Sequence, residues 1–163
     1  MSKLATQESG QQFLTFCLQQ DTYAVDTDFV REISEFRTVT QVPLMPDFVF
    51  GVYNLRGEVV PVIDLAVRFG RGKTEISRQS CLLVLDIPFE GGIATLGVLV
   101  DRVEDVLEIA ASDIEPAPSF GAKLHSHFIR GVARIADQLV ILLKAEQVLS
   151  IDEMSSLIKH MNQ

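Results

Sequence analysis

The sequence predicts a mainly β protein, in which two small barrels pack against each other and helices are short and few. Short apolar runs rich in Val, Ile, Leu and Phe, each bounded by Gly, Pro, Asp or Gln, are typical of strands. The spacing between them leaves no room for the crossover helices of a parallel sheet, so most pairs should be antiparallel. Several runs are apolar at nearly every position, which indicates strands buried on both faces. Two packed barrels would bury strands in this way.

The strand pattern recurs from the first apolar run to the last. We expect strands at residues 13–18, 35–42, 48–55, 58–64, 80–87, 94–103, 128–136 and 138–144. Pro61 lacks an N–H group, so its strand should have an edge or a bulge at that point.

Two short helices are expected within this β framework. The segment 26–33, DTDFVREI, places Phe29, Val30 and Ile33 on one side, with acidic residues near its start. That pattern favours two helical turns. Asp64 should cap a second, shorter turn over the residues LAVRF.

The domain organisation follows from composition along the chain. We expect a flexible tail over 1–12, one domain over 13–149 and a C-terminal helix over 150–163. Ser150 and Glu153 form the capping box of that helix. The polar segment 71–79 is the best candidate for an internal linker between the two barrels, and 117–127 is expected to be a surface loop.

Composition and charge restrict the class of protein. Apolar residues make up 47% of the 163 residues, and 14 basic against 22 acidic side chains give a net charge of −8, which disfavours nucleic acid as a partner. No apolar run approaches the ~18 residues of a membrane-spanning helix, and the polar start MSKLATQESGQQ lacks the core of a secretory signal. We therefore expect a cytosolic protein. Cys17 and Cys81 each lie in an apolar run, which indicates reduced, buried thiols rather than a disulfide.

Evidence for catalysis or metal binding is weak. None of the common catalytic or nucleotide-binding motifs occurs. His125 and His127 would share a face of a strand and touch one metal, but exposed loop histidines are the preferred interpretation because no third ligand is identifiable. The carboxylates of the segment 101–108 lack the ligand spacing of a calcium loop, so a solvated face is expected. A barrel enzyme or small-ligand binder using Asp101, Asp64 and His125 remains a minor alternative, and we expect neither cofactor nor metal.

The segment NLRG, between the strands 48–55 and 58–64, predicts a tight β-hairpin. Gly57 can adopt the positive φ that the reversal requires. Arg56 should then project from the tip with its guanidinium free to form bidentate hydrogen bonds with a partner. A plain polar turn residue is the alternative.

The ordered run of motifs resembles the CheW family, the coupling proteins of bacterial chemotaxis. The matching blocks are QFLTFCLQQDTYAVDTDFVREI, VPLMPDFVFGVYNLRGEVVPVIDLAVRFG, LGVLVDRVEDVLEI, IEPAP and FIRGVARIADQLVILLKAEQVL. The resemblance implies two intertwined five-stranded barrels of the SH3-like kind, with an apolar core shared between them. It also implies a protein without catalytic activity.

The family links the cytoplasmic tips of chemoreceptors to a CheA-type histidine kinase, whose regulatory domain has the same fold. The resemblance therefore implies a receptor tip, that kinase domain and further adaptor copies in rings as partners. A related chemosensory array that controls pili or another output is the open alternative. The 71–79 and LHSH segments depart from the family's simplest pattern.

The resemblance also implies which residues contact receptor or kinase. By position in the motifs they are Arg56, Val30, Glu32, Gly51, Gly57, Gly97, Val103, Val106 and Leu82. Gly51 is expected to permit a close backbone approach, and Val30 has a competing role in the core. The positions Gly97, Val103 and Val106 match the neighbourhood of a groove between the barrels, where a receptor helix would bind.

Overall fold

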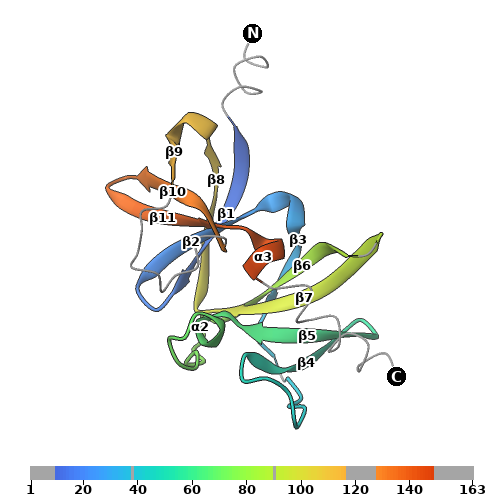
Figure 1. The fold of residues 1–163 in the computed structure, drawn as a ribbon. Helices are drawn as coiled ribbons and strands as arrows, with labels where there is room; N and C mark the ends of the chain where they lie inside the picture. The colour runs from blue at the N-terminus through green and yellow to red at the C-terminus, as the bar shows by residue number, and fades with distance from the viewer. Residues whose placement is uncertain (1–9, 38, 90, 117–127, 149–163) are drawn as a thin grey trace.

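The chain folds into two curled sheets that lie side by side and share a core (Figure 1). A computed structural model describes residues 10–37, 39–89, 91–116 and 128–148. The elements are β1 (Gln11–Leu18), β2 (Asp21–Asp26), η1 (Thr27–Phe29), β3 (Val30–Glu35), β4 (Val49–Leu55), β5 (Glu58–Asp64), α2 (Leu65–Arg68), β6 (Cys81–Phe89), β7 (Gly92–Val100), β8 (Arg102–Ile109), η2 (Ala111–Asp113), β9 (Ile114–Glu115), β10 (Ile129–Ile135), β11 (Gln138–Leu143) and α3 (Ala145–Val148).

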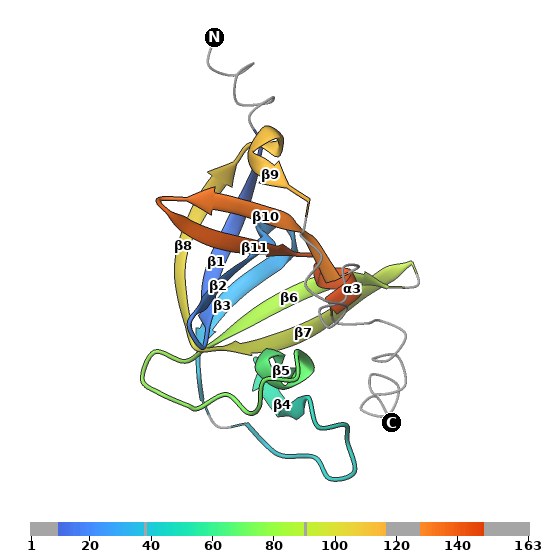
Figure 2. The same ribbon diagram turned by 60° about the vertical axis from the view of Figure 1, so that its left-hand side comes forward.

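The two sheets interleave the chain. Over the described residues, one sheet has six strands in the order β8-β1-β2-β11-β10-β9, and the other has five in the order β3-β6-β7-β5-β4. The first sheet thus joins the earliest and latest strands, while the second holds β3 to β7. Pairing is antiparallel except between β2 and β11 and between β5 and β7, which confirms the prediction. Residues 71–79 lie between α2, which follows β5, and β6, so they connect two strands of the same five-stranded sheet (Figure 2).

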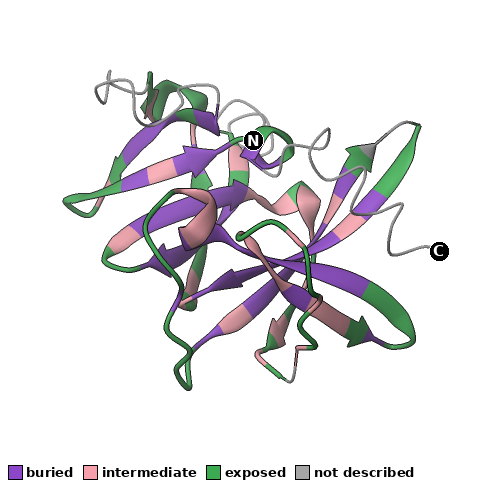
Figure 3. Cartoon of the chain, turned by 60° about the horizontal axis from the view of Figure 1, so that its bottom comes forward, coloured by how far each residue is buried: buried purple, intermediate pink, exposed green. Residues whose placement is uncertain are grey.

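One apolar core is shared by the two sheets. The buried faces of both meet in a single cluster, so burial is concentrated along the strands, while the hairpin tips are exposed (Figure 3). Phe16, Leu18 and Val25 come from the six-stranded sheet, and Leu83 and Val98 come from the other. This confirms the predicted mainly β fold of two packed barrel-like units and the core between them.

Most predicted strands are present, with differences at their ends. The strand 58–64 matches β5, whereas the predicted strand 94–103 is divided at Asp101 between β7 and β8. The predicted strand 35–42 was wrong over most of its length, because among the described residues of this segment beyond Glu35 only Thr40 forms a bridge, to Val52. The strand β2 was not predicted, since its sequence DTYAVD is short and begins with polar residues.

The predicted helix over 26–33 was also wrong. The segment has one 3-10 turn, η1, followed by the strand β3. Asp26 caps the turn by accepting a hydrogen bond from the Asp28 N–H at 2.9 Å. Beyond Phe29 the backbone is extended because β3 pairs along β6, and this long-range pairing outweighs the local helical pattern.

Several smaller predictions concern the loops and cysteines. Asp64 does cap α2, and Cys17 and Cys81 are both free thiols, the first buried and the second half-buried. Pro61 lies opposite Val52 in β4, and the pairing of β5 with β7 begins one residue later. Among the described residues, no helix combines the length and apolarity needed to cross a bilayer. Residues 1–9 of the tail predicted over 1–12, the whole loop 117–127 with His125 and His127, and the predicted helix over 150–163 lie outside the described residues. Gln11 and Gln12 of that predicted tail belong to β1.

Candidate functional site

The hairpin between β4 and β5 ends in a two-residue turn. Arg56 has φ of 53° and Gly57 has φ of 89°, as a type I′ turn requires at both central positions. The Asn54 side-chain oxygen accepts a hydrogen bond from the Gly57 N–H at 2.8 Å and holds the turn closed. The predicted tight reversal at Gly57 is confirmed, and it places Arg56 at the tip of the hairpin.

The guanidinium of Arg56 is not free, which corrects the prediction. Its Nη1 and Nη2 donate to the two carboxylate oxygens of Glu32 in β3, at 2.8 and 3.3 Å. This hydrogen bond is also the main reason why the pKa of Arg56 is raised. The Arg56 side chain is nevertheless 74% exposed. The pair is therefore an oriented surface charge, with the outer face of the guanidinium turned to solvent.

The Arg56–Glu32 pair belongs to a seam that closes the five-stranded sheet. In that sheet β3 and β4 lie at opposite edges, yet side chains join them. The hydroxyls of Ser34 and Tyr53 lie 3.2 Å apart, two residues along β3 from Glu32. Side-chain bonds thus complete the barrel where backbone pairing stops, and the hairpin tip is part of this closure.

Gly51 permits a close backbone approach, as predicted. A Cβ atom at this position would lie 2.4 Å from the Thr40 carbonyl oxygen and 2.6 Å from the Val39 side chain. The space is taken by the bridge in which Thr40 and Val52 exchange backbone hydrogen bonds at 2.9 and 2.7 Å. Gly51 therefore seats the segment before β4 on the sheet, and it supports the hairpin from within.

Three further predicted contact residues face the interior. Leu82 is fully buried in a cluster with Val62 and Leu99, so in this structure it packs the sheet and does not reach the surface. Gly97 is buried in β7 between its paired strands. Val30 is half-buried against the shared core, which agrees with its core role.

Val103 and Val106 lie on β8, at the edge of the six-stranded sheet. Val103 is half-buried against the shared core, whereas Val106 is 54% exposed. Arg56 and Glu32 are predicted contact residues that a described side-chain contact brings together from different elements, and they lie in the five-stranded sheet. The predicted positions thus fall into two groups on the two barrels.

Carboxylates weighed as catalytic or metal-binding groups have structural partners. Asp64 accepts from the Ala66 and Thr74 backbone N–H groups, and Asp101 accepts from the Gln19 N–H at 2.6 Å. Glu104 accepts from the Cys17 thiol at 3.2 Å; burial first, and Glu104 second, raise the pKa of that thiol. These acids therefore hold backbone and side chains in place.

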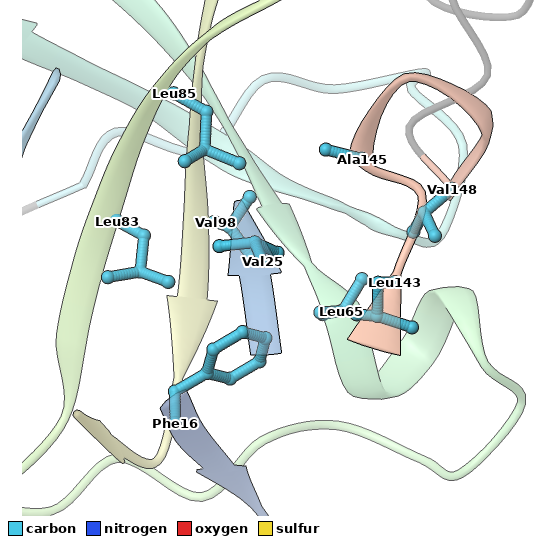
Figure 4. Close-up of a pocket in the computed structure, with 9 residues that line it drawn as sticks. All are labelled: Phe16, Val25, Leu65, Leu83, Leu85, Val98, Leu143, Ala145 and Val148. Carbon is cyan, nitrogen blue, oxygen red and sulfur yellow. The ribbon is translucent and has the colours of Figure 1, made fainter. Parts of the chain in front are cut away.

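One cavity lies at the junction between the two sheets. Its volume is about 10 Å³, the room of roughly one water molecule. Figure 4 shows it lined by apolar side chains, with Phe16 and Val25 from one sheet, Leu83 and Val98 from the other, and Val148 of α3 at the side. A helix cannot enter this space, so a groove for a receptor helix would have to lie outside it.

An open depression was not predicted from the sequence. Its volume is about 550 Å³, and Met45, Phe50 and Val67 are among the residues that line it. The preceding residue, Leu44, is fully exposed with a φ of 64°, at the bend of the segment before β4. The signal in the sequence was the pair LM between two prolines, VPLMP, which is unusually apolar for a loop.

Comparisons with known proteins agree in family and in fold. The family model described as the CheW-like domain matches residues 12–153. The Chemotaxis protein CheW of Klebsiella aerogenes is 37% identical over 155 residues, which cover 95% of this chain and 91% of that protein. The Chemotaxis protein CheW of Rhizobium meliloti is 30% identical over 144 residues, which cover 88% of this chain and 90% of that protein. The crystal structure of the scaffolding protein TtCheW from Thermoanaerobacter tengcongensis has a TM-score of 0.77 and 31% identity, covering 88% of this chain and 90% of that one.

Proposed function

The chain belongs to the CheW family, and on that premise we propose that it is a non-catalytic adaptor that couples chemoreceptors to a CheA-type histidine kinase. The observation that carries the proposal is the exposed Arg56 guanidinium, oriented by Glu32 at the tip of a rigid hairpin. An adaptor needs such fixed surfaces and no reactive groups. The carboxylates that could have served catalysis are used in the fold.

Two half-exposed apolar side chains adjoin the ion pair in sequence. Ile33 follows Glu32 in β3 and Val59 lies two residues after Gly57, and both side chains are about half exposed. Apolar side chains beside an oriented charge pair exclude water when a partner binds, and they strengthen the charge-assisted hydrogen bonds of the arginine. We propose that this surface, named here the hairpin surface (Glu32, Ile33, Arg56 and Val59), contacts the receptor tip or the kinase regulatory domain.

The shared core explains how one small protein could serve several partners. Because both sheets pack on one cluster, surfaces on β3 to β5 and on β8 keep a constant relation to each other. We propose that the kinase domain and further adaptor copies bind barrel edges, in a cytoplasmic array below the receptors. Each contact is then small, with a Kd of about 1 μM or weaker, and the array supplies the strength.

The test is reconstitution of receptor-controlled kinase activity. A soluble receptor tip fragment and the kinase are combined with this protein, and kinase autophosphorylation is measured. We expect activation that depends on the protein, with about tenfold weaker binding of a partner in Arg56→Ala and Arg56→Glu. Arg134→Ala, an exposed arginine of β10 on the other sheet, is the matched control.

Circular dichroism of each variant must show an intact fold. Arg56 variants that fold and bind every array component normally would remove the residue from the proposed surface. A nanomolar one-to-one complex with isolated receptor would contradict the role of the array in affinity.

A further inference from the structure

A second set of ion pairs joins the same hairpin to the same strand. Arg31 Nη1 lies 3.2 Å from a carboxylate oxygen of Glu58, and its Nε donates to Asp86 in β6 at 3.2 Å. Asp86 in turn accepts from the Thr95 hydroxyl of β7 at 2.7 Å. Arg31 thus ties the hairpin to two strands in the middle of the sheet.

A β-bulge explains why neighbouring residues can both reach the hairpin. Val30 pairs with Leu85, but Glu32 pairs with Val84, so the register shifts and Arg31 is the extra residue. In a regular strand Arg31 and Glu32 would point to opposite faces, whereas a bulge re-aims one of two adjacent side chains. Both then meet the hairpin, Arg31 at Glu58 and Glu32 at Arg56.

The two ion pairs have opposite polarity. In the Arg31–Glu58 pair the arginine comes from β3, whereas in the Arg56–Glu32 pair it comes from the hairpin. The hairpin residues of the two pairs, Arg56 and Glu58, lie on either side of Gly57. A single exposed pair is held weakly, but several charges in a network hold a geometry better. Without Arg31, the Glu58 carboxylate would lose its cation and would be free to compete with Glu32 for Arg56, which is only two residues away.

We propose that Arg31 is a positioning residue for the hairpin surface, which keeps Arg56 paired with Glu32 by holding Glu58 and Asp86. The inference rests on the proposed function only in treating that pair as a partner contact. The ion pairs of Arg31 with Glu58 and Asp86 are distances within this chain and do not depend on a partner. Arg31 need not touch a partner to act.

The first experiment measures the Arg56–Glu32 pair directly. NMR of the labelled guanidinium measures the rate of rotation about the Nε–Cζ bond of Arg56. This rotation slows when both Nη groups form hydrogen bonds. We expect Arg31→Gln to speed this rotation about two- to fivefold, the size of one exposed ion-pair contact. Glu58→Gln removes the competing carboxylate, so it should leave the rotation of Arg56 unchanged, and combined with Arg31→Gln it should restore the slow rotation.

Arg71→Gln is the matched control for this measurement. Arg71 also forms an exposed ion pair, to Asp21 at 2.5 Å, and its side chain is 35% exposed against 39% for Arg31. The Arg71→Gln variant should leave the rotation of the Arg56 guanidinium unchanged. If Arg31→Gln also leaves the rotation unchanged, or if Arg31→Gln speeds it equally with and without Glu58→Gln, the inference is overturned.

The second experiment separates this inference from the proposed function. A soluble fragment holding the tip of a methyl-accepting chemotaxis receptor is titrated against the same variants and Arg56→Ala. We expect Arg31→Gln to weaken binding, but less than Arg56→Ala does. Faster Arg56 rotation with unchanged binding in both variants would uphold the positioning role and refute the hairpin surface. Weaker binding by Arg56→Ala alone, with unchanged rotation in Arg31→Gln, would refute the positioning role.

Discussion

Asp64 and Thr74 form a buried pair in which one carboxylate accepts two hydrogen bonds, from the Thr74 hydroxyl at 2.7 Å and from its N–H at 2.9 Å. The same carboxylate caps α2 through the Ala66 N–H at 3.1 Å. It therefore joins the end of β5, the helix and the 71–79 segment. Because that segment is fixed at Thr74, it is an anchored connection rather than a free linker.

The first prediction concerns this carboxylate. Asp64→Ala should lower the free energy of unfolding by about 3 kcal/mol, because it removes a cap and leaves the buried Thr74 groups without a partner. Urea denaturation measures the loss. Asp113→Ala is the control, since Asp113 is exposed in η2, and it should change stability by less than about 0.5 kcal/mol. An Asp64→Ala loss as small as that of the control would contradict the assigned role.

A second prediction compares two buried glycines. Gly51→Ala should cost about 2 kcal/mol or more, because the new Cβ meets the Thr40 backbone, which cannot turn aside as a side chain can. Gly97→Ala should cost less than about 1 kcal/mol, because its nearest neighbour would be the Val62 side chain at 3.5 Å, an ordinary contact. Thermal or urea unfolding gives both values. Equal effects would show that the segment at Thr40 yields easily.

The third prediction is a pH dependence at Cys17. Burial disfavours the thiolate, so the pKa of this thiol lies above its ordinary value of 9.0. Little thiolate is then present at pH 8, and alkylation by iodoacetamide should be about tenfold or more slower in the folded protein than in urea. Peptide mass spectrometry follows the reaction. The preference of the folded state for the thiol also means that this contribution to stability is present below pH 9.0 and is lost as the pH rises further.

A fourth prediction separates the two valines of β8. Val103→Asp should lower the free energy of unfolding by about 3 kcal/mol, since it places a charge against the shared core. Val106→Asp should cost less than about 1 kcal/mol, because the side chain is 54% exposed. If Val106 contacts the receptor, its variant should still weaken binding of the tip fragment. Normal folding together with normal binding would remove Val106 from the contact surface.

The strands that could be predicted are those with strong local signals. The run EVVPVID has apolar residues at its five inner positions, and it matches β5. Asp64 was predicted as a cap because it directly precedes a short apolar turn. In both cases neighbours in sequence determine the structure.

The errors arise where distant partners decide the structure. Phe29, Val30 and Ile33 suit one face of a helix, but pairing with β6 and the bulge at Arg31 make the segment a strand. The tip of the hairpin was predicted, yet the partner of Arg56 was not. Glu32 lies in another strand, and only closure of the barrel brings its carboxylate to the guanidinium.

The parallel pairing of β2 with β11 has a consequence for the order in which the protein can form. Thr22 faces Val140 across this pair, so the six-stranded sheet cannot be completed until the last described strand, β11, has left the ribosome. The five-stranded sheet, by contrast, is drawn wholly from consecutive strands. We expect the five-stranded sheet to assemble first on the nascent chain, while the apolar faces of β1 and β2 stay exposed until the late strands are made. Premature termination before β11 should therefore yield an aggregation-prone product.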